Sequence, residues 1–273
     1  MAIFTLLLAA ALLIAWFLAG DKVLAAYYRS RERALGPTER AQLARDMPLF
    51  PALPEQLQHK LLGLVSQFLA RTRFVGCAGL TVTERMKNLV AAQACLLLLG
   101  RDELAYPGVS TVYLYPDDFL TPHELHLPGG VVDVREKRLS GESWPDGRVV
   151  LSWASCKRSA ANPFDGENLI FHEFAHQLDQ AKGQATGAPL QASLDDARAW
   201  QQVFLESYDR HCRAVELGVN DLIDGYGAQS PVEFFAVVTE VFFEKAAALA
   251  EAEPRLYEQL RQFYGLDPRY WQP

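Results

Sequence analysis

Residues 171–176 read Phe-His-Glu-Phe-Ala-His, and this H-E-x-x-H spacing constrains the fold more than any other stretch of the chain. Side chains four residues apart lie one above the other on an α-helix. His172 and His176 can therefore aim two imidazole nitrogens at one metal ion only if the segment is helical. Glu173 lies next to the first histidine and can reach a water molecule on that metal.

The residues around the motif support a helix. Apolar side chains recur on one face, and we expect a helix over about 166–182, with Asp165 as its N-cap and Gly183 at its end. The motif then lies in the middle of the helix. The alternative is that both histidines simply line a helix surface.

Composition limits the remaining possibilities. The chain has 273 residues, of which 50% are hydrophobic and 22% are charged, with a net charge of −7. This is globular composition, which excludes a disordered or collagen-like chain. An acidic chain without basic runs is also a poor nucleic-acid binder. None of the four cysteines forms a C-x-x-C pair, which argues against a zinc ribbon or a redox motif.

Periodicity predicts a mostly helical α+β domain with a small sheet. Expected helices cover about 54–71, 83–100, 166–182, 194–216, 231–247 and 254–263, and expected strands cover 111–115, 130–134 and 148–153. We divide the chain into three parts. Residues 1–20 are a predicted transmembrane segment, residues 21–49 are a linker with a short helix, and residues 50–273 are the predicted catalytic domain that carries the H-E-x-x-H motif.

A catalytic zinc site needs a third protein ligand. His211 lies between charged residues of a predicted helix and is expected at the surface, while His123 and His126 lie in a Pro-bracketed segment expected to be an exposed loop. Glu233 is the preferred ligand, because it lies on a very apolar helix where a buried carboxylate needs a partner. Glu240, seven residues further on, is the alternative ligand.

The position of Glu233 also has a simpler explanation. Ser230 is a predicted N-cap, Pro231 takes the first helical position, and Glu233 is at the third. Glu233 could therefore serve only to complete a capping box.

Several separate motifs resemble one known family. They are His-Glu-Phe-Ala-His-Gln-Leu-Asp at 172–179, Pro-Val-Glu-Phe-Phe-Ala-Val-Val-Thr-Glu-Val-Phe-Phe at 231–243, Val-Tyr-Leu-Tyr-Pro at 112–116, Gly-Glu-Ser-Trp at 141–144, Val-Leu-Ser-Trp at 150–153 and Phe-Tyr-Gly-Leu-Asp-Pro at 263–268. Over roughly residues 50–270 the chain is similar to the Mlc titration factor A family of zinc-dependent peptidases, whose metal-site helices resemble the catalytic domain of anthrax lethal factor, a zincin.

The resemblance implies a role for each motif residue. It makes His172, His176 and Glu233 the ligands of one Zn²⁺ ion and Glu173 the catalytic base. It also implies that Tyr226, seven residues before the glutamate ligand, stabilises the oxyanion. A loop aromatic packed on the core is the alternative for Tyr226. The family further implies aminopeptidase-type activity and binding to the glucose repressor Mlc.

Two neighbouring features leave alternatives open. In zincins a strand placed like 148–153 forms the edge of the cleft and pairs with extended substrate, but it could also be an ordinary sheet strand. Asp179 either orients a ligand histidine or is a carboxylate on the helix surface.

Residues 2–19 form an uncharged run in which Thr5 is the only polar residue. As a helix the run spans roughly 27 Å, close to the thickness of a bilayer core. A signal peptide and a buried core helix are alternatives, but no Lys or Arg precedes the run and it has no polar stripe. All nearby positive charges follow it, so we expect a membrane anchor with residues 21–273 in the cytoplasm.

Two other classes of function remain alongside a zinc peptidase acting on peptides or proteins. The chain could be a zinc-regulated module that binds a transcription factor, with hydrolysis secondary, although an intact Glu173 argues against this. It could also be a membrane quality-control protease, but residues 166–182 carry too many polar groups to lie in lipid.

Overall fold

The structure is a computed structural model that describes residues 23, 26–101, 105–127, 131–181, 185–189, 191–219 and 222–272, with the backbone alone for 121–127 and 131–138. The predicted transmembrane segment at residues 2–19 lies outside these ranges. Within the described residues, no helix combines the length and apolar character needed to cross a membrane.

A small mixed sheet lies beside helices, which confirms the predicted mostly helical α+β class. The strands β1 (Arg73–Gly76), β2 (Thr111–Tyr115), β6 (Arg148–Ser152) and β5 (Gly141–Ser143) pair in the order β1-β2-β6-β5. The first three are parallel and β5 runs antiparallel to β6. β5 therefore forms one edge of the sheet.

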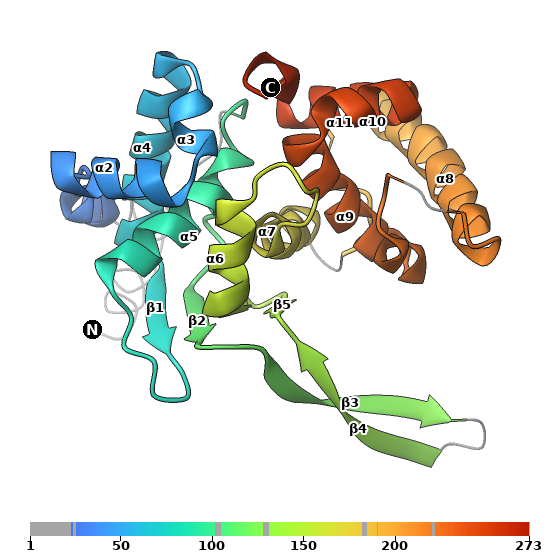
Figure 1. The fold of residues 1–273 in the computed structure, drawn as a ribbon, viewed down its shortest axis with the longest axis horizontal. Coiled ribbons are helices and arrows are strands. Elements are labelled where there is room, and N and C mark those ends of the chain that lie inside the picture. Colours follow the sequence, from blue (N-terminus) through green and yellow to red (C-terminus); the bar gives the residue numbers. More distant parts are fainter. Residues whose placement is uncertain are drawn as a thin grey trace, which may run out of the picture.

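Figure 1 shows the helices in two groups on either side of α7 (Leu169–Asp179). The first group includes α2 (Pro37–Asp46), α3 (Leu49–Ala52), α4 (Glu55–Arg71), α5 (Glu84–Leu96) and α6 (Trp153–Ala161). The second includes α8 (Leu194–Glu216), α9 (Pro231–Glu244), α10 (Ala246–Ala252) and α11 (Pro254–Tyr264), with 3-10 turns η1 (Gly225–Gln229) and η2 (Pro268–Tyr270).

Buried aromatic residues fix α7 between the two groups. Phe174 packs edge-on against Phe68 and Tyr106, with ring centroids 5.7 and 4.9 Å away. On the other side, the centroid of Phe171 lies 5.5 Å from that of Phe243 in α9. Aromatic pairs at such distances add specific geometry to the burial of apolar surface. The helix that bears the motif is thus held on both sides.

Several predicted boundaries were wrong for local reasons. α7 begins at Leu169 because Asn168, not Asp165, accepts the backbone N–H groups of Ile170 and Phe171, and it ends at Asp179, before Gly183. The predicted strand 148–153 ends at Ser152, which caps the unpredicted helix α6. The predicted helix 231–247 is interrupted at Lys245 between α9 and α10.

The segment expected to be a loop around His123 and His126 is a strand. It forms β3 (Phe119–Leu127), which pairs antiparallel with β4 (Val131–Leu139). This hairpin projects away from the helices at the bottom of Figure 1. The predicted strand 130–134 falls largely within β4.

The stretch assigned to the linker, residues 21–49, contributes to the core. The described part of it contains a helix over 26–31 and all of α2. Leu35, Leu43 and Met47 are at most 2% exposed and pack with the core of the later helices.

Candidate metal centre

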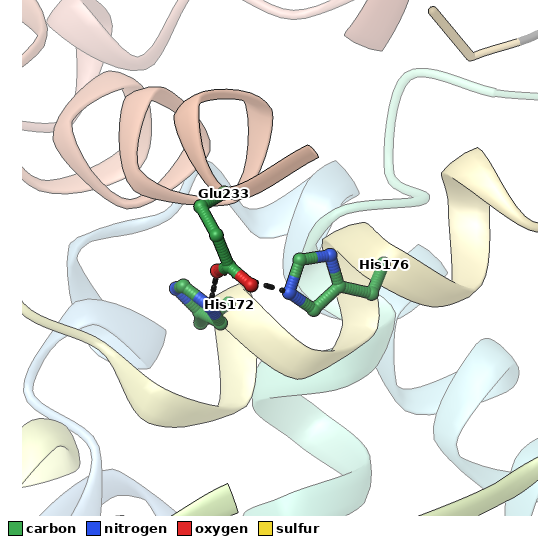
Figure 2. Close-up of side chains that lie close together, drawn as sticks. All are labelled: His172, His176 and Glu233. Carbon is green, nitrogen blue, oxygen red and sulfur yellow. Dashed lines mark hydrogen bonds and ion pairs between the residues drawn. The ribbon is translucent and has the colours of Figure 1, made fainter. Parts of the chain in front are cut away.

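Two helices bring the predicted ligands together. His172 and His176 lie on α7, and Glu233 lies at the start of α9, which packs against α7. One ligand atom from each of the three residues lies within 4.8 Å of the others, so they could hold a metal ion. Figure 2 shows both imidazoles and the carboxylate pointing toward one another.

The individual distances show which atoms face the common point. Glu233 Oε2 lies 3.0 Å from His172 Nε2 and 3.5 Å from His176 Nε2. Both histidines therefore present the same ring nitrogen to one carboxylate oxygen. This geometry agrees with the preference for Glu233 over Glu240 as the third member of the group.

The capping arrangement and the metal geometry coexist at Glu233. Its backbone N–H donates to the Ser230 hydroxyl, as the sequence predicted for an N-cap. Its side chain does not close a capping box but points to the histidines. Burial opposes ionisation, yet the contacts with His172 and His176 hold the pKa of Glu233 well below its usual value. The carboxylate is thus available as an anionic ligand.

Glu240 orients His172 from the opposite side of the ring. Its Oε1 lies 2.8 Å from His172 Nδ1, and its Oε2 accepts the backbone N–H of Asn168. Despite burial, the hydrogen bonds to Glu233 and Glu240 hold the pKa of His172 well above its usual value. A carboxylate on the far nitrogen fixes the tautomer and the orientation of a ligand histidine. Glu240 therefore meets the far nitrogen of His172 and lies outside the group of described residues that could hold a metal.

Asn168 connects this carboxylate to a buried polar network. Its Nδ2 donates to Gln93 Oε1 and to Glu244 Oε1, both at 2.8 Å, while its Oδ1 caps α7. Burial raises the pKa of Glu244 to about 8. The sequence analysis missed Asn168, although an Asn four residues before the first motif histidine is a strong N-cap signal.

Glu173 is buried beside the histidines, with 5% of its surface exposed. Burial raises its pKa to about 8, against the lowering effect of His172. Gly141 on β5 makes room for the carboxylate, because a Cβ at this position would lie under 3.0 Å from Glu173 Oε1. The edge of the sheet and the motif helix therefore approach each other closely here.

A cleft of about 430 Å³ opens at these residues. It is lined by His172, Glu173 and Glu240 together with Gly141 from β5 and Tyr226 from η1. The ring centroid of Tyr226 lies 5.8 Å from that of His172. Burial and the carboxylates of Glu233 and Glu173 raise the pKa of Tyr226 to about 12, so its hydroxyl stays protonated at neutral pH.

Other candidate residues lie elsewhere. His211 was expected at the surface but is only 2% exposed, and its Nε2 donates to the backbone oxygen of Asp224. It supports the turn that carries Tyr226.

Asp179, at the end of α7, is buried. Its Oδ2 accepts the backbone N–H groups of Thr186 and Gly187. Its Oδ1 and His176 Nδ1 have no hydrogen-bond partner among the described residues. His123 and His126 lie on β3, where the structure describes the backbone alone.

Two helix-borne histidines facing a carboxylate at the side of a cleft, with a buried glutamate beside them, are typical of metallopeptidases. Comparison with known sequences agrees with this class. The profile of the glucose-regulated metallo-peptidase M90 family matches residues 24–265, and the chain belongs to this family.

Relatives match over most of their length. A Synechocystis protein, slr2042, is 37% identical over 238 residues, which is 87% of this chain and 86% of the relative. Mlc titration factor A from Escherichia coli O127:H6 is 36% identical over 234 residues, covering 83% and 86%. The Pectobacterium atrosepticum protein of the same name is 34% identical over 235 residues, covering 84% and 87%. The resemblance noted in the sequence is thereby confirmed.

Proposed function

We propose that the chain is a zinc-dependent peptidase in which His172, His176 and Glu233 hold the metal and Glu173 is the general base. The observation that carries this proposal is the convergence of three ligand atoms within 4.8 Å next to a buried glutamate. The donor set suits zinc, which takes imidazole nitrogens and carboxylate oxygens and keeps an open position in catalytic sites. Because Glu240 contacts His172 Nδ1, the metal would take Nε2, the ring nitrogen that faces Glu233.

A bound zinc ion would polarise the substrate carbonyl, and it would lower the pKa of its bound water toward about 7. The residues of the chain do the remaining work. Glu173 accepts the proton of the attacking water at a carboxylate oxygen and then donates it to the leaving amine. Burial, which raises the pKa of Glu173, makes this carboxylate a stronger base. The Tyr226 hydroxyl donates a hydrogen bond to the oxyanion that develops on the substrate.

The edge strand β5 is the surface that suits an extended peptide. The resemblance to zincins implied this role for 148–153, with an ordinary sheet strand as the alternative, but β6 is paired on both sides, with β2 and with β5. β5 leaves one backbone edge unpaired within the described sheet, and its Gly141 lines the cleft. An extended substrate can add to such an edge through main-chain hydrogen bonds, which are insensitive to substrate sequence.

The relatives' name points to a second role, binding of the repressor Mlc. Two relatives at 34–36% identity are called Mlc titration factor A. The binding module is the alternative function, with hydrolysis secondary. Titration of purified Mlc with wild-type and Glu173→Gln chains separates the two roles. Equal binding supports a partner role independent of chemistry, and no binding by either chain removes it.

The aminopeptidase preference is a further part of the proposal. A library of peptides with free and acetylated N-termini tests it, using zinc-loaded and metal-stripped full-length protein. We expect cleavage only by the zinc-loaded chain, starting at free N-termini. Cleavage of both peptide sets at internal bonds would instead indicate an endopeptidase. Absence of cleavage by a zinc-loaded chain would overturn the peptidase proposal.

We also propose that residues 2–19 anchor the chain in the cytoplasmic membrane, with the catalytic domain in the cytoplasm. The uncharged run and the positive charges that follow it support this orientation. Alkali-resistant membrane fractionation, together with protease added outside spheroplasts, tests it. A mature chain that begins after residue 19 and is free in the periplasm would contradict it.

A further inference from the structure

A second cavity of about 340 Å³ lies away from the metal centre, beside β1 and the N-terminal end of α5. Four cationic side chains from three separate segments line it, and we call it the basic groove: Arg31, Arg33, Arg73 and Lys87. The one acidic residue in its lining is Glu84. These cations lie together in a chain whose net charge is −7.

Two of these cations have carboxylate partners and two do not. Arg33 pairs with Glu39 at 2.6 Å, and Lys87 pairs with Glu84 at 2.7 Å. Arg31 makes one described hydrogen bond, to the Tyr27 hydroxyl at 3.3 Å. The guanidinium of Arg73 has no hydrogen bond or ion pair with another described residue. The groove therefore keeps positive charge that the described part of the chain does not neutralise.

The groove lies close to the apolar run in the sequence. Arg71 at the end of α4 lies over the Tyr28 ring, 4.8 Å from its centroid, and holds the helix over 26–31 against the domain. Arg31 follows Ala19, the last residue of the run, by twelve positions, since 31 − 19 = 12. Twelve residues span about 18 Å as a helix, so a membrane-inserted run would keep the groove near the lipid headgroups.

We propose that the basic groove binds the phosphate of anionic phospholipids in the membrane that residues 2–19 enter. This inference rests on the proposed membrane anchor. Clustered Lys and Arg next to a membrane segment bind anionic headgroups, and each such residue strengthens the interaction roughly fivefold. Contacts at both the anchor and the groove would hold the catalytic domain in one orientation relative to the bilayer.

Full-length protein in lipid nanodiscs tests the inference. Backbone hydrogen exchange is measured for residues 26–33, 71–76 and 84–88 in discs of phosphatidylcholine alone and in discs containing phosphatidylglycerol. We expect slower exchange in these segments only with phosphatidylglycerol, and loss of the effect in high salt. The double variant Arg31→Glu/Arg73→Glu should lose the effect, because removal of two cations alone weakens binding about 25-fold.

The matched control is Arg198→Glu/Arg213→Glu, which makes the same charge change on α8, at the far side of the molecule in Figure 1. It should keep the protection. Incorporation into both kinds of disc with unchanged exchange in the groove would overturn the groove and leave the anchor intact. Failure to enter either disc would overturn both. Equal protection by inorganic phosphate in phosphatidylcholine discs would show a site for soluble phosphate and contradict the lipid proposal.

Discussion

Replacement of Gly141 by alanine tests how closely the sheet edge fits the proposed base. A Cβ at this position would lie 2.8 Å from Glu173 Cδ and 2.7 Å from Leu169 Cδ1. Carbon atoms pack at about 3.5–4.0 Å, so the carboxylate must retreat by about 1 Å. A misplacement of about 1 Å can reduce the rate about 100-fold. Gly141 does not have a positive φ, so alanine can adopt the same backbone conformation.

The assay measures kcat/KM on a peptide, zinc per chain and thermal stability for the same sample of Gly141→Ala. We expect a fall in kcat/KM of about 100-fold, near-normal zinc content and a loss of about 1–3 kcal/mol from overpacking. The control is Gly63→Ala in α4, where an added Cβ would meet nothing within 4 Å. It should keep full activity. If Gly141→Ala stays within threefold of the wild-type rate, the fit between β5 and Glu173 does not matter for catalysis.

Further predictions concern the residues around the centre. Glu233→Ala should abolish stoichiometric zinc binding, whereas Glu240→Gln should weaken zinc affinity by about 10- to 100-fold, measured by competition with a chelator; equal losses would contradict the different roles given to them. Tyr226→Phe should lower kcat by about 100- to 1000-fold without changing zinc content, and an unchanged kcat would remove Tyr226 from the mechanism. Burial raises the pKa of Glu244 from 4.5 to about 8, so its contribution to stability is complete below pH 4.5 and is lost as the pH rises through 8. Glu244→Gln should therefore flatten the decline of melting temperature between pH 5 and 9, and an identical decline would show that another group causes it.

The sequence predicted the ligand group because its constraints are local. Histidines four residues apart on a helix share a face in any fold. The apolar helix offered both Glu233 and Glu240, so the sequence indicated a preference for the third member and not a single choice. The helix over 194–216 was predicted with its observed bounds because a polar N-cap, Ser193, and an amphipathic pattern both mark it. Such signals depend on residues close together in the sequence.

What the sequence did not reveal depends on contacts between distant segments. His211 has charged neighbours in the sequence, yet its ring stacks on Phe234, with centroids 5.5 Å apart. Glu240 was considered a ligand because it shares a helix face with Glu233, and only the packing of α9 on α7 shows that it meets the far nitrogen of His172. The hairpin of β3 and β4 was missed because Pro122 suggested a loop, whereas an edge strand tolerates a proline.

The most direct test of the central claim is the peptidase rate of zinc-loaded Glu173→Gln, with the metal quantified in the same sample. The amide keeps the shape of the side chain but cannot accept the proton of the attacking water. The proposed mechanism predicts one zinc per chain and a loss of about 100- to 10,000-fold or more in kcat. A variant that carries one zinc and turns over at nearly the wild-type rate would contradict the assignment of Glu173 as the base.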